Sequence, residues 1–509
     1  MSISFLQELP IFTLVVLLVP LYLYLYLRRS NGRSKGPAVC PTNWPILYMF
    51  PSLLTNLFNV HDYLTIVLAA SGHNCRAHGP PGTGMRFFIT CDPANVRHIF
   101  TTNYANFPKG EDFAAIFDIM VGSLFTVDGE PCRQQRAKMQ SVLRNPQLVA
   151  RVAASCRDKV EKGLVPLFTH MASTDTTFDL QEVITRFMFD LTATMIFSVD
   201  PGLLSTDMPP MDVAAAMDTV MEVGFFRHTV PAFCWKVMRL LSIGPERKLE
   251  VAQRVLRGFV TEMIMQKRKM KQLQEGCEED ILSSYIDDPN FDDNLLRSTL
   301  FSSMLAGRDT LGMTLLWFLY NLAQNPKVVS TIRNELSLVA SHKASSDDAI
   351  VIFEPEETKS LVYLRAALYE TLRLYPPGPF ERKTVAADDT MPSGHEVRAG
   401  DTIIVSLHSM GRMEGVWGKD CLEYNPDRWL SDGGNKLRYV PSHKFLAFNS
   451  GPRMCIGKDI AVMEMATIVA AVVWNFDVEV LEGQTIQPKL SCVLQMKDGL
   501  KVNLKQREM

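Results

Sequence analysis

Hydrophobic positions recur at helical spacing over most of the chain. Residues 149–273 read as several amphipathic helices separated by short turns, such as the one at Asp200-Pro201-Gly202. Two long apolar segments, residues 295–324 and 458–475, predict two further helices. Three short segments are predicted to be strands: residues 84–90, 403–407 and 491–496. This pattern predicts a mainly α protein with a small β region.

Residues 1–35 differ in composition from the rest of the chain. Residues 11–27 are nearly all apolar, and a helix of about 17 residues would span roughly 25 Å, short for a bilayer core but workable with its flanks. The basic residues Arg28, Arg29, Arg33 and Lys35 follow at once, and the positive-inside rule keeps that side cytosolic. A cleaved signal peptide is the alternative, but no small-residue cleavage site follows. We expect a single transmembrane anchor in residues 1–35, in the endoplasmic reticulum, and one cytosolic domain in residues 36–509.

The overall composition fits one large buried core. The chain of 509 residues exceeds the usual size of a domain, but no strong linker interrupts it after the first fifty residues. Hydrophobic residues make up 47% and charged residues 21%, and a net charge of −3 gives no indication of a nucleic-acid partner. The ten cysteines form no CxxC pairs, which argues against a zinc ribbon or a disulfide scaffold and favours a reducing compartment.

Residues 448–457 carry a cysteine at the start of a predicted helix. Phe448, Gly451, Arg453, Cys455 and Gly457 give the pattern F-x-x-G-x-R-x-C-x-G. A sulfur at a helix N-terminus favours the thiolate, and a thiolate is a good axial ligand for haem iron. The two glycines allow tight turns and close backbone approach, and the arginine is placed to reach a haem propionate. A lone cysteine is more often a small core residue, but four further residues at fixed offsets weaken that alternative here.

The apolar pattern of residues 295–324 is interrupted by Ala306-Gly307-Arg308-Asp309-Thr310. The small side chains at positions 306 and 307 allow something large to lie flat against the helix. The acid and the hydroxyl at positions 309 and 310 suit the activation of oxygen at haem, which needs two protons. A threonine within a helix ordinarily bonds back to its own backbone, which is the alternative interpretation.

Glu370 and Arg373 lie three residues apart and would share one face of a helix. Such a pair alone is common on solvated helix faces. Here Leu374-Tyr375-Pro376-Pro377 follows directly, and Pro426-Asp427-Arg428-Trp429 occurs further along.

Taken in order, these four segments resemble the signatures of the cytochrome P-450 superfamily, the haem-thiolate monooxygenases. The resemblance implies a mainly α fold with a small β part, a buried haem b with Cys455 as the axial thiolate, and Asp309 with Thr310 at the oxygen-activation site. It implies that Glu370 and Arg373 lock to Arg428 in a structural role. It also implies electrons from an NADPH–cytochrome P-450 reductase, a hydrophobic small-molecule substrate, and contact with membrane lipid through the N-terminal helix.

Residues 128–136 resemble the helix of the family in which a Trp and an Arg point at the haem propionates. Arg136 matches the pattern, but Cys132 stands where Trp is usual, which removes one expected hydrogen bond. The resemblance places residues 111–125 over the haem and residues 378–381 beside it. The basic residues that would offer a docking face to the reductase are Arg133, Arg136, Lys138, Arg144 and Lys458. The pocket candidates are Phe113, Ile116, Phe117, Met120, Met217, Met221, Phe225, Phe226 and Leu494, although each of them singly is as easily an ordinary core residue.

Within the superfamily the chain resembles the plant fatty-acid and alkane hydroxylase clan, through residues 306–310, 411–418 and 448–453. Residues 106–110 and 179–181 are similar to its alkane-hydroxylase family, which has a branch of noroxomaritidine synthases in amaryllis-type plants. Two reactions follow from this resemblance: oxidative coupling of two phenol rings in a norbelladine-type alkaloid precursor, which we favour slightly, and mid-chain or terminal hydroxylation of a long aliphatic chain. The departures at Cys132, Leu311 and Gly378 suggest drift from the ordinary hydroxylase pattern. Reductase-independent rearrangement of a peroxide is a remote third reading, against which the acid–hydroxyl pair argues.

Overall fold

The computed structural model describes residues 44, 47–273, 280–341, 343 and 350–507. Its longer helices are α3 (Val60–Ala70), α6 (Gly129–Leu143), α7 (Pro146–Lys159), α8 (Val165–Ser173), α9 (Leu180–Phe197), α10 (Asp212–Thr229), α11 (Ala232–Leu240), α12 (Gly244–Gln272), α14 (Asp293–Gln324), α15 (Pro326–Ala340), α17 (Val362–Leu374) and α20 (Lys458–Asn475). The shorter ones are α2 (Phe50–Thr55), α4 (Pro93–Arg97), α5 (Gly110–Ile116), α13 (Ile281–Tyr285), α16 (Pro355–Thr358), α18 (Leu407–Met410) and α19 (Glu414–Trp417). The prediction of a mainly α fold is confirmed.

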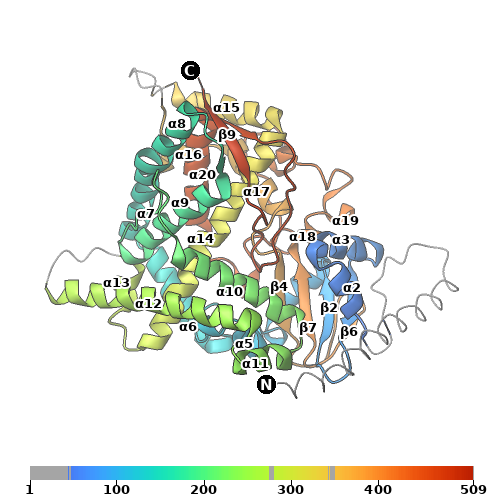
Figure 1. The fold of residues 1–509 in the computed structure, drawn as a ribbon. Helices are drawn as coiled ribbons and strands as arrows, with labels where there is room; N and C mark the ends of the chain where they lie inside the picture. The colour runs from blue at the N-terminus through green and yellow to red at the C-terminus, as the bar shows by residue number, and fades with distance from the viewer. Residues whose placement is uncertain (1–43, 45–46, 274–279, 342, 344–349, 508–509) are drawn as a thin grey trace, which may run out of the picture.

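The strands form three small sheets. The largest has the order β1-β2-β7-β4, from β1 (Asn74–His78), β2 (Arg86–Thr90), β7 (Thr402–Ser406) and β4 (Phe380–Thr384). Within it β2 and β7 are parallel and the other pairs are antiparallel. The second sheet joins β3 (Phe178–Asp179), β9 (Lys501–Gln506) and β8 (Phe476–Val480), and the third pairs β5 (Asp389–Thr390) with β6 (Glu396–Val397). The large sheet lies with α2 and α3 on one side of the molecule and most long helices lie on the other (Figure 1).

Two of the three predicted strands are confirmed, and the third is wrong. Residues 491–496 form a turn, with one isolated bridge between Met496 and Pro488. The backbone N–H groups of Cys492 and Leu494 donate to the carbonyl oxygens of Met221 and Pro377 (3.2 and 2.9 Å). These groups therefore bond to two distant segments instead of to a neighbouring strand, which their local sequence could not reveal.

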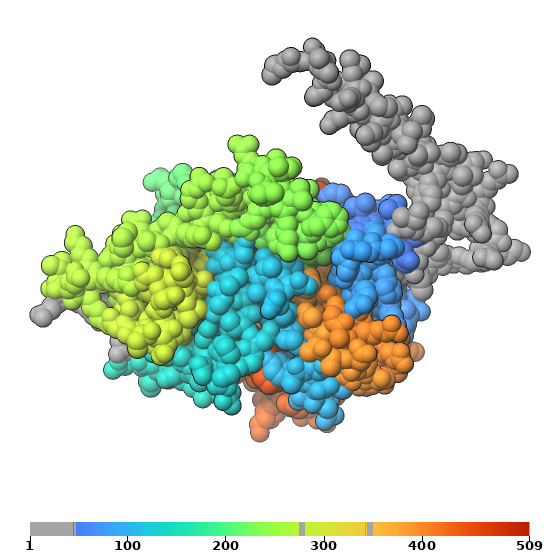
Figure 2. Space-filling view, turned by 90° about the horizontal axis from the view of Figure 1, so that it is seen from below, coloured from blue at the N-terminus to red at the C-terminus, as the bar shows by residue number. Residues whose placement is uncertain are grey.

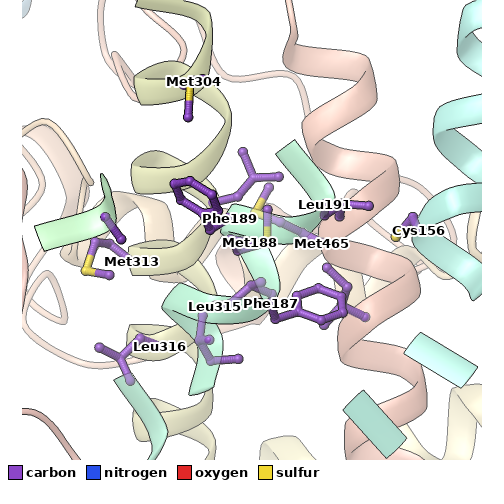
Figure 3. Close-up of a cluster of buried hydrophobic side chains, with 14 of the residues drawn as sticks. Cys156, Phe187, Met188, Phe189, Leu191, Met304, Met313, Leu315, Leu316 and Met465 are labelled. Atoms are coloured by element: carbon purple, nitrogen blue, oxygen red, sulfur yellow. The ribbon is translucent and has the colours of Figure 1, made fainter. Parts of the chain in front are cut away.

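Helix α14 runs through the centre of the molecule and is buried along most of its length. The side chain of Asp292 caps it by accepting a hydrogen bond from the N–H of Leu295 (2.7 Å), and its helical hydrogen bonding continues through residues 306–310. Figure 3 shows apolar side chains of α9, among them Phe187, Met188 and Phe189, between α14 and α20. A helix that is apolar on all sides requires neighbours on all sides, and this requirement places α14 against the helix that follows Cys455.

In the part of the chain that the structure describes, no helix combines the length and hydropathy needed to cross a membrane. The predicted anchor, residues 11–27, lies outside the described residues.

Candidate active site

A cavity of about 640 Å³ lies between α14 and the segment that precedes α20. This volume is within the range of small-molecule pockets, roughly 300–1,000 Å³, and most of the lining is apolar. It brings together most of the residues that the sequence analysis named as site residues: Arg136, Ala306, Asp309, Thr310, Phe448, Arg453 and Cys455. Gly457 also lines it, whereas Gly451 does not.

The loop that carries Cys455 is held by its backbone. The N–H of Cys455 donates to the carbonyl oxygen of Phe448 (2.8 Å). Gly451 has φ +59°, and a β-carbon on it would collide with the carbonyl oxygen of Phe100. Glycine is therefore needed here for its conformation and for close packing, as expected. At Gly457 no atom of the described residues lies within 4 Å of the place its β-carbon would take, so the space beside it is open.

The fold shifts the pKa of Cys455 in the direction opposite to the one expected from the helix start. Burial raises the pKa of the thiol, and this effect outweighs the N–H of Gly457, Arg136 and Lys458, which lower it. The start of α20 therefore does not by itself secure the thiolate. A metal cation bound there would do so, because coordination deprotonates a thiol outright.

The shape of the cavity fits a flat group beside Cys455. Ala306 lies in the middle of a helix of 32 residues and yet its side chain is exposed, because it faces the cavity. The open space at Gly457 lies along the same cavity. Gly307 has a different role from the one expected, since a β-carbon there would lie 2.9 Å from Thr192 on α9. Its small size allows α9 and α14 to pack closely.

Several cations surround the same space. Arg136 donates to the carbonyl oxygen of Met454 (2.6 Å), and Arg453 contacts Asp128 (2.6 Å) and Tyr104 (3.0 Å). Two further cationic side chains, which the sequence analysis did not single out, also line the cavity: Lys109 and Arg382. Burial lowers the pKa of Lys109 to about 7, and within the described part of the chain the buried Nε of Arg382 has no hydrogen-bond partner. Cationic side chains buried without full pairing suit a ligand that carries carboxylates.

Asp309 is buried beside an arginine of its own helix. Its Oδ1 accepts from Arg308 (2.8 Å), which also contacts Asp218 of α10 (2.9 Å). Its Oδ2 has no hydrogen-bond partner among the described residues. Burial raises the pKa of Asp309 to about 6, although Arg308 opposes the shift. This carboxyl group can therefore hold or release a proton near neutral pH.

The hydroxyl group of Thr310 donates to the carbonyl oxygen of Ala306 (2.7 Å). This bond to its own helix is the alternative that the sequence left open. It uses the proton of the hydroxyl group and leaves the lone pairs of Oγ1 available on a residue that lines the cavity.

Glu370, Arg373 and Arg428 meet in one buried network away from the cavity. Glu370 accepts two hydrogen bonds from Arg373 (2.7 and 2.8 Å) and one from Arg428 (2.9 Å). Trp429 and the backbone of Asn425 donate to the same carboxylate (2.9 Å each). Arg373 also donates to the carbonyl oxygens of Cys421 and Glu423. The network ties α17 to the chain between residues 411 and 429.

The pocket candidates divide into two groups. Phe113, Phe117, Met221 and Phe225 line the cavity. The remaining ones are not among its lining residues: Ile116, Met120, Met217, Phe226 and Leu494. Near Leu494 the cavity is lined by Cys492 and Val493 instead. The backbone N–H of Leu494 donates to Pro377, and its carbonyl oxygen accepts a hydrogen bond from Trp317. Gly378 and Glu381 also line the cavity.

Comparison with known proteins places these observations in a family. The cytochrome P-450 family profile matches residues 41–504. Noroxomaritidine synthase 1 of Narcissus pseudonarcissus is 35% identical over 97% of this chain and 96% of its own length. Noroxomaritidine synthase 2 of the same species is 36% identical over 94% of this chain and 93% of its own length. Alkane hydroxylase MAH1 of Arabidopsis thaliana is 35% identical over 97% of this chain and 98% of its own length.

A helical fold with a cysteine loop facing a central helix across an apolar cavity is that of a haem-thiolate protein. The chain belongs to the cytochrome P-450 family. It is an oxidoreductase of the monooxygenase type, and its cofactor is haem whose iron is held by a cysteine thiolate.

Proposed function

We propose that this enzyme couples two phenol rings within one hydrophobic plant metabolite, a norbelladine-type alkaloid precursor. The observation that carries the proposal is an aromatic wall of the cavity, formed by Phe113, Phe117 and Phe125. Their ring centroids lie 5.0 to 5.3 Å apart, and the ammonium group of Lys109 lies over two of them. Flat rings pack well against such a wall in stacked or edge-to-face contacts. The similarity to two noroxomaritidine synthases supports the same choice.

Haem bound at Cys455 would supply the oxidation of the phenols by O2 and NADPH-derived electrons. Ring coupling removes two hydrogen atoms from the substrate, and O2 with NADPH and a proton leaves as two waters and NADP+. Arg136 and Arg453 would hold the haem propionates, and Phe448, Gly457 and Ala306 would flank the ring. The residues of this chain would then bind the substrate, exclude water and transfer protons.

We assign the delivery of protons in the active site to Asp309 and Thr310. Oδ2 of Asp309 is buried without a hydrogen-bond partner among the described residues, and the raised pKa allows it to take up and release a proton near neutral pH. Oγ1 of Thr310 has lone pairs toward the cavity while its own proton is bound to Ala306. We infer that Asp309 stores the proton and that Thr310 orients the group which receives it. Glu370, Arg373 and Arg428 have a structural role only.

A membrane setting is part of the proposal. Exposed apolar residues lie on two neighbouring parts of the surface: Leu47, Leu54, Phe58 and Ile66 near α2 and α3, and Phe233, Val237, Leu240, Leu241 and Ile243 on and after α11. Figure 2 shows the green surface around α11 next to the blue surface of α2 and α3. Such patches favour contact with lipid, beside an N-terminal anchor in the endoplasmic reticulum membrane.

The reductase would dock on the basic face that includes α6 and the start of α20. Arg144 is exposed there, while Arg133 and Lys138 are engaged with Glu130 and Asp288. Surface pairs of this kind contribute little to stability, so both cations stay available to a partner.

A second candidate is hydroxylation of a long aliphatic chain. It is favoured by the extension of the cavity to Leu53, Val60 and Leu64 of α2 and α3, which offers room for a chain beyond the aromatic wall. The similarity to an alkane hydroxylase supports it.

The two candidates differ in the fate of oxygen. The holoenzyme with reductase, NADPH and ¹⁸O2 should convert a norbelladine-type bisphenol to a product two mass units lighter that contains no ¹⁸O. A long-chain alkane offered in parallel should remain largely unchanged. If only the alkane reacts and gains ¹⁸O, ring coupling is wrong and chain hydroxylation takes its place.

A further inference from the structure

His228 stands at the end of α10, beside the aromatic wall, and lines the cavity. Its Nδ1 lies 2.7 Å from the carbonyl oxygen of Gly224. A carbonyl oxygen only accepts, so Nδ1 carries the hydrogen and donates it. In a neutral imidazole the other ring nitrogen, Nε2, then has a lone pair and no hydrogen.

The surroundings of His228 keep its ring neutral. Burial, and after it the charge of Arg382, lower the pKa of His228 to about 3, although the bond to Gly224 opposes the shift. No described residue donates a hydrogen bond to Nε2. The ring therefore offers the cavity an acceptor, and not a cation, throughout the physiological pH range.

Other polar side chains near the cavity use their protons locally. The hydroxyl of Thr229 donates to Phe226 (2.8 Å), and those of Ser302 and Ser303 donate to Thr299 (2.9 and 2.8 Å). A hydroxyl group can still turn its proton toward a ligand, whereas the neutral ring of His228 has its single N–H proton engaged at Gly224 and can only accept. In an apolar pocket such a group favours a ligand that brings a donor.

The aromatic wall places rings next to this acceptor. The centroids of Phe113 and Phe117 lie 6.3 and 5.7 Å from that of the imidazole. Gly224 makes this arrangement possible, because a β-carbon there would lie 2.8 Å from the ring of Phe117. A substrate ring packed against the wall would bring a hydroxyl group on its edge within reach of the imidazole edge.

We propose that Nε2 of His228 accepts a hydrogen bond from a hydroxyl group on an aromatic substrate, so that the enzyme selects phenols over their ethers. This specificity role deepens the proposed function and rests on it, because a pure hydrocarbon has no donor to offer. His228 acts through binding and takes no part in the removal of electrons from the ring.

Two substitutions distinguish the contributions of the two ring nitrogens to binding. His228→Gln places an amide near the position of Nε2, whereas His228→Asn places one near Nδ1 and leaves the far position empty. The probes are 4-hexylphenol and 4-hexylanisole, which differ by one methyl group on oxygen. Their dissociation constants are measured from the shift of the Soret band of the holoprotein, with the unliganded spectrum and circular dichroism as the check of folding.

The wild-type protein should bind the phenol about tenfold more tightly than the ether, the value of one hydrogen bond that would otherwise be unmade. His228→Gln should keep most of this preference, whereas His228→Asn should bind the two probes about equally tightly. Equal binding of both probes by the wild-type protein, or an unchanged preference in His228→Asn, would overturn the inference.

The failure of this inference can be told from failure of the proposed function. If the bisphenol is coupled without ¹⁸O but the phenol preference is absent, the inference about His228 is wrong and ring coupling stands. If the preference is present but ¹⁸O enters an alkane and no ring coupling occurs, His228 recognises hydroxyl groups in an enzyme with a different reaction.

Discussion

Glu464 is a carboxyl group buried in α20, the helix that follows Cys455. It is 5% exposed and lines the cavity, and no described cation or hydrogen-bond donor contacts its carboxyl group. Burial raises the pKa of Glu464 to about 8 from its ordinary value of 4.5. The folded protein therefore holds a proton on this side chain at neutral pH, and the unfolded chain has already released it.

This difference makes stability depend on pH with a definite sign. Because the folded pKa is the higher one, the contribution of Glu464 is fully present below pH 4.5 and is lost as the pH rises toward 8. At about 1.4 kcal/mol per pH unit, the loss between pH 4.5 and pH 7 is roughly 3 kcal/mol. Glu464→Gln removes the titrating carboxyl group and keeps the shape of the side chain. The free energy of unfolding of this variant should therefore lose roughly 3 kcal/mol less than that of the wild type between pH 4.5 and pH 7.

The assay is urea denaturation of the holoprotein at several pH values from 5 to 8, followed by circular dichroism and by the Soret band. Coincident transitions in both signals would justify a two-state treatment. The free energy of unfolding of Glu464→Gln, relative to the wild type, should rise by roughly 2.5 kcal/mol between pH 5 and 7. Glu482→Gln, at an exposed position, is the control and should follow the wild type. Parallel pH dependences for Glu464→Gln and the wild type would refute the burial argument.

The remaining predictions concern the cavity and the fold around it. Cys455→Ser should abolish the thiolate-type Soret band in the carbon monoxide difference spectrum, while Cys492→Ser, also in the cavity, should keep it. Asp309→Asn should lower product formation roughly 100-fold while NADPH is still consumed, and equal losses of both would contradict a proton role. Glu370→Gln leaves two buried arginines without their carboxylate and should cost roughly 3–5 kcal/mol in the free energy of unfolding, against a negligible effect of Glu356→Gln at the surface. Gly451→Ala should cost roughly 1–3 kcal/mol more than Gly202→Ala, because both glycines have positive φ (+59° and +66°) but only the first meets another backbone. Equal costs would show that the contact with Phe100 is relieved easily.

The sequence pattern was sufficient to predict a structural feature wherever the interactions that form the feature are local. The helix after Cys455 begins and ends where the apolar segment predicts it, at Lys458 and Asn475, and the strands near residues 86–90 and 402–406 follow from short segments. Glu370 and Arg373 share a helix face because they are three residues apart. Each of these features depends on hydrogen bonds and periodicity within a few neighbouring residues.

Other features of the site depend on residues far apart in the chain. Arg308 reaches Asp218 across 90 positions, and the turn at residues 491–496 is held by Met221 and Pro377. The pKa of Cys455 also depends on distant residues, because burial by the surrounding fold raises it and outweighs the local amide and cations, which lower it.

The sequence by itself thus determined the mainly α fold, the order of the motifs and the prediction of Cys455 as the haem ligand, since each is encoded in short segments. Only the tertiary structure decided which side chains share the cavity, which carboxyl groups are buried enough to keep a proton, and that His228 offers an acceptor there. Solvent exclusion and the juxtaposition of α5, α10 and α14 arise from the packing of the whole chain, and no single segment contains that information.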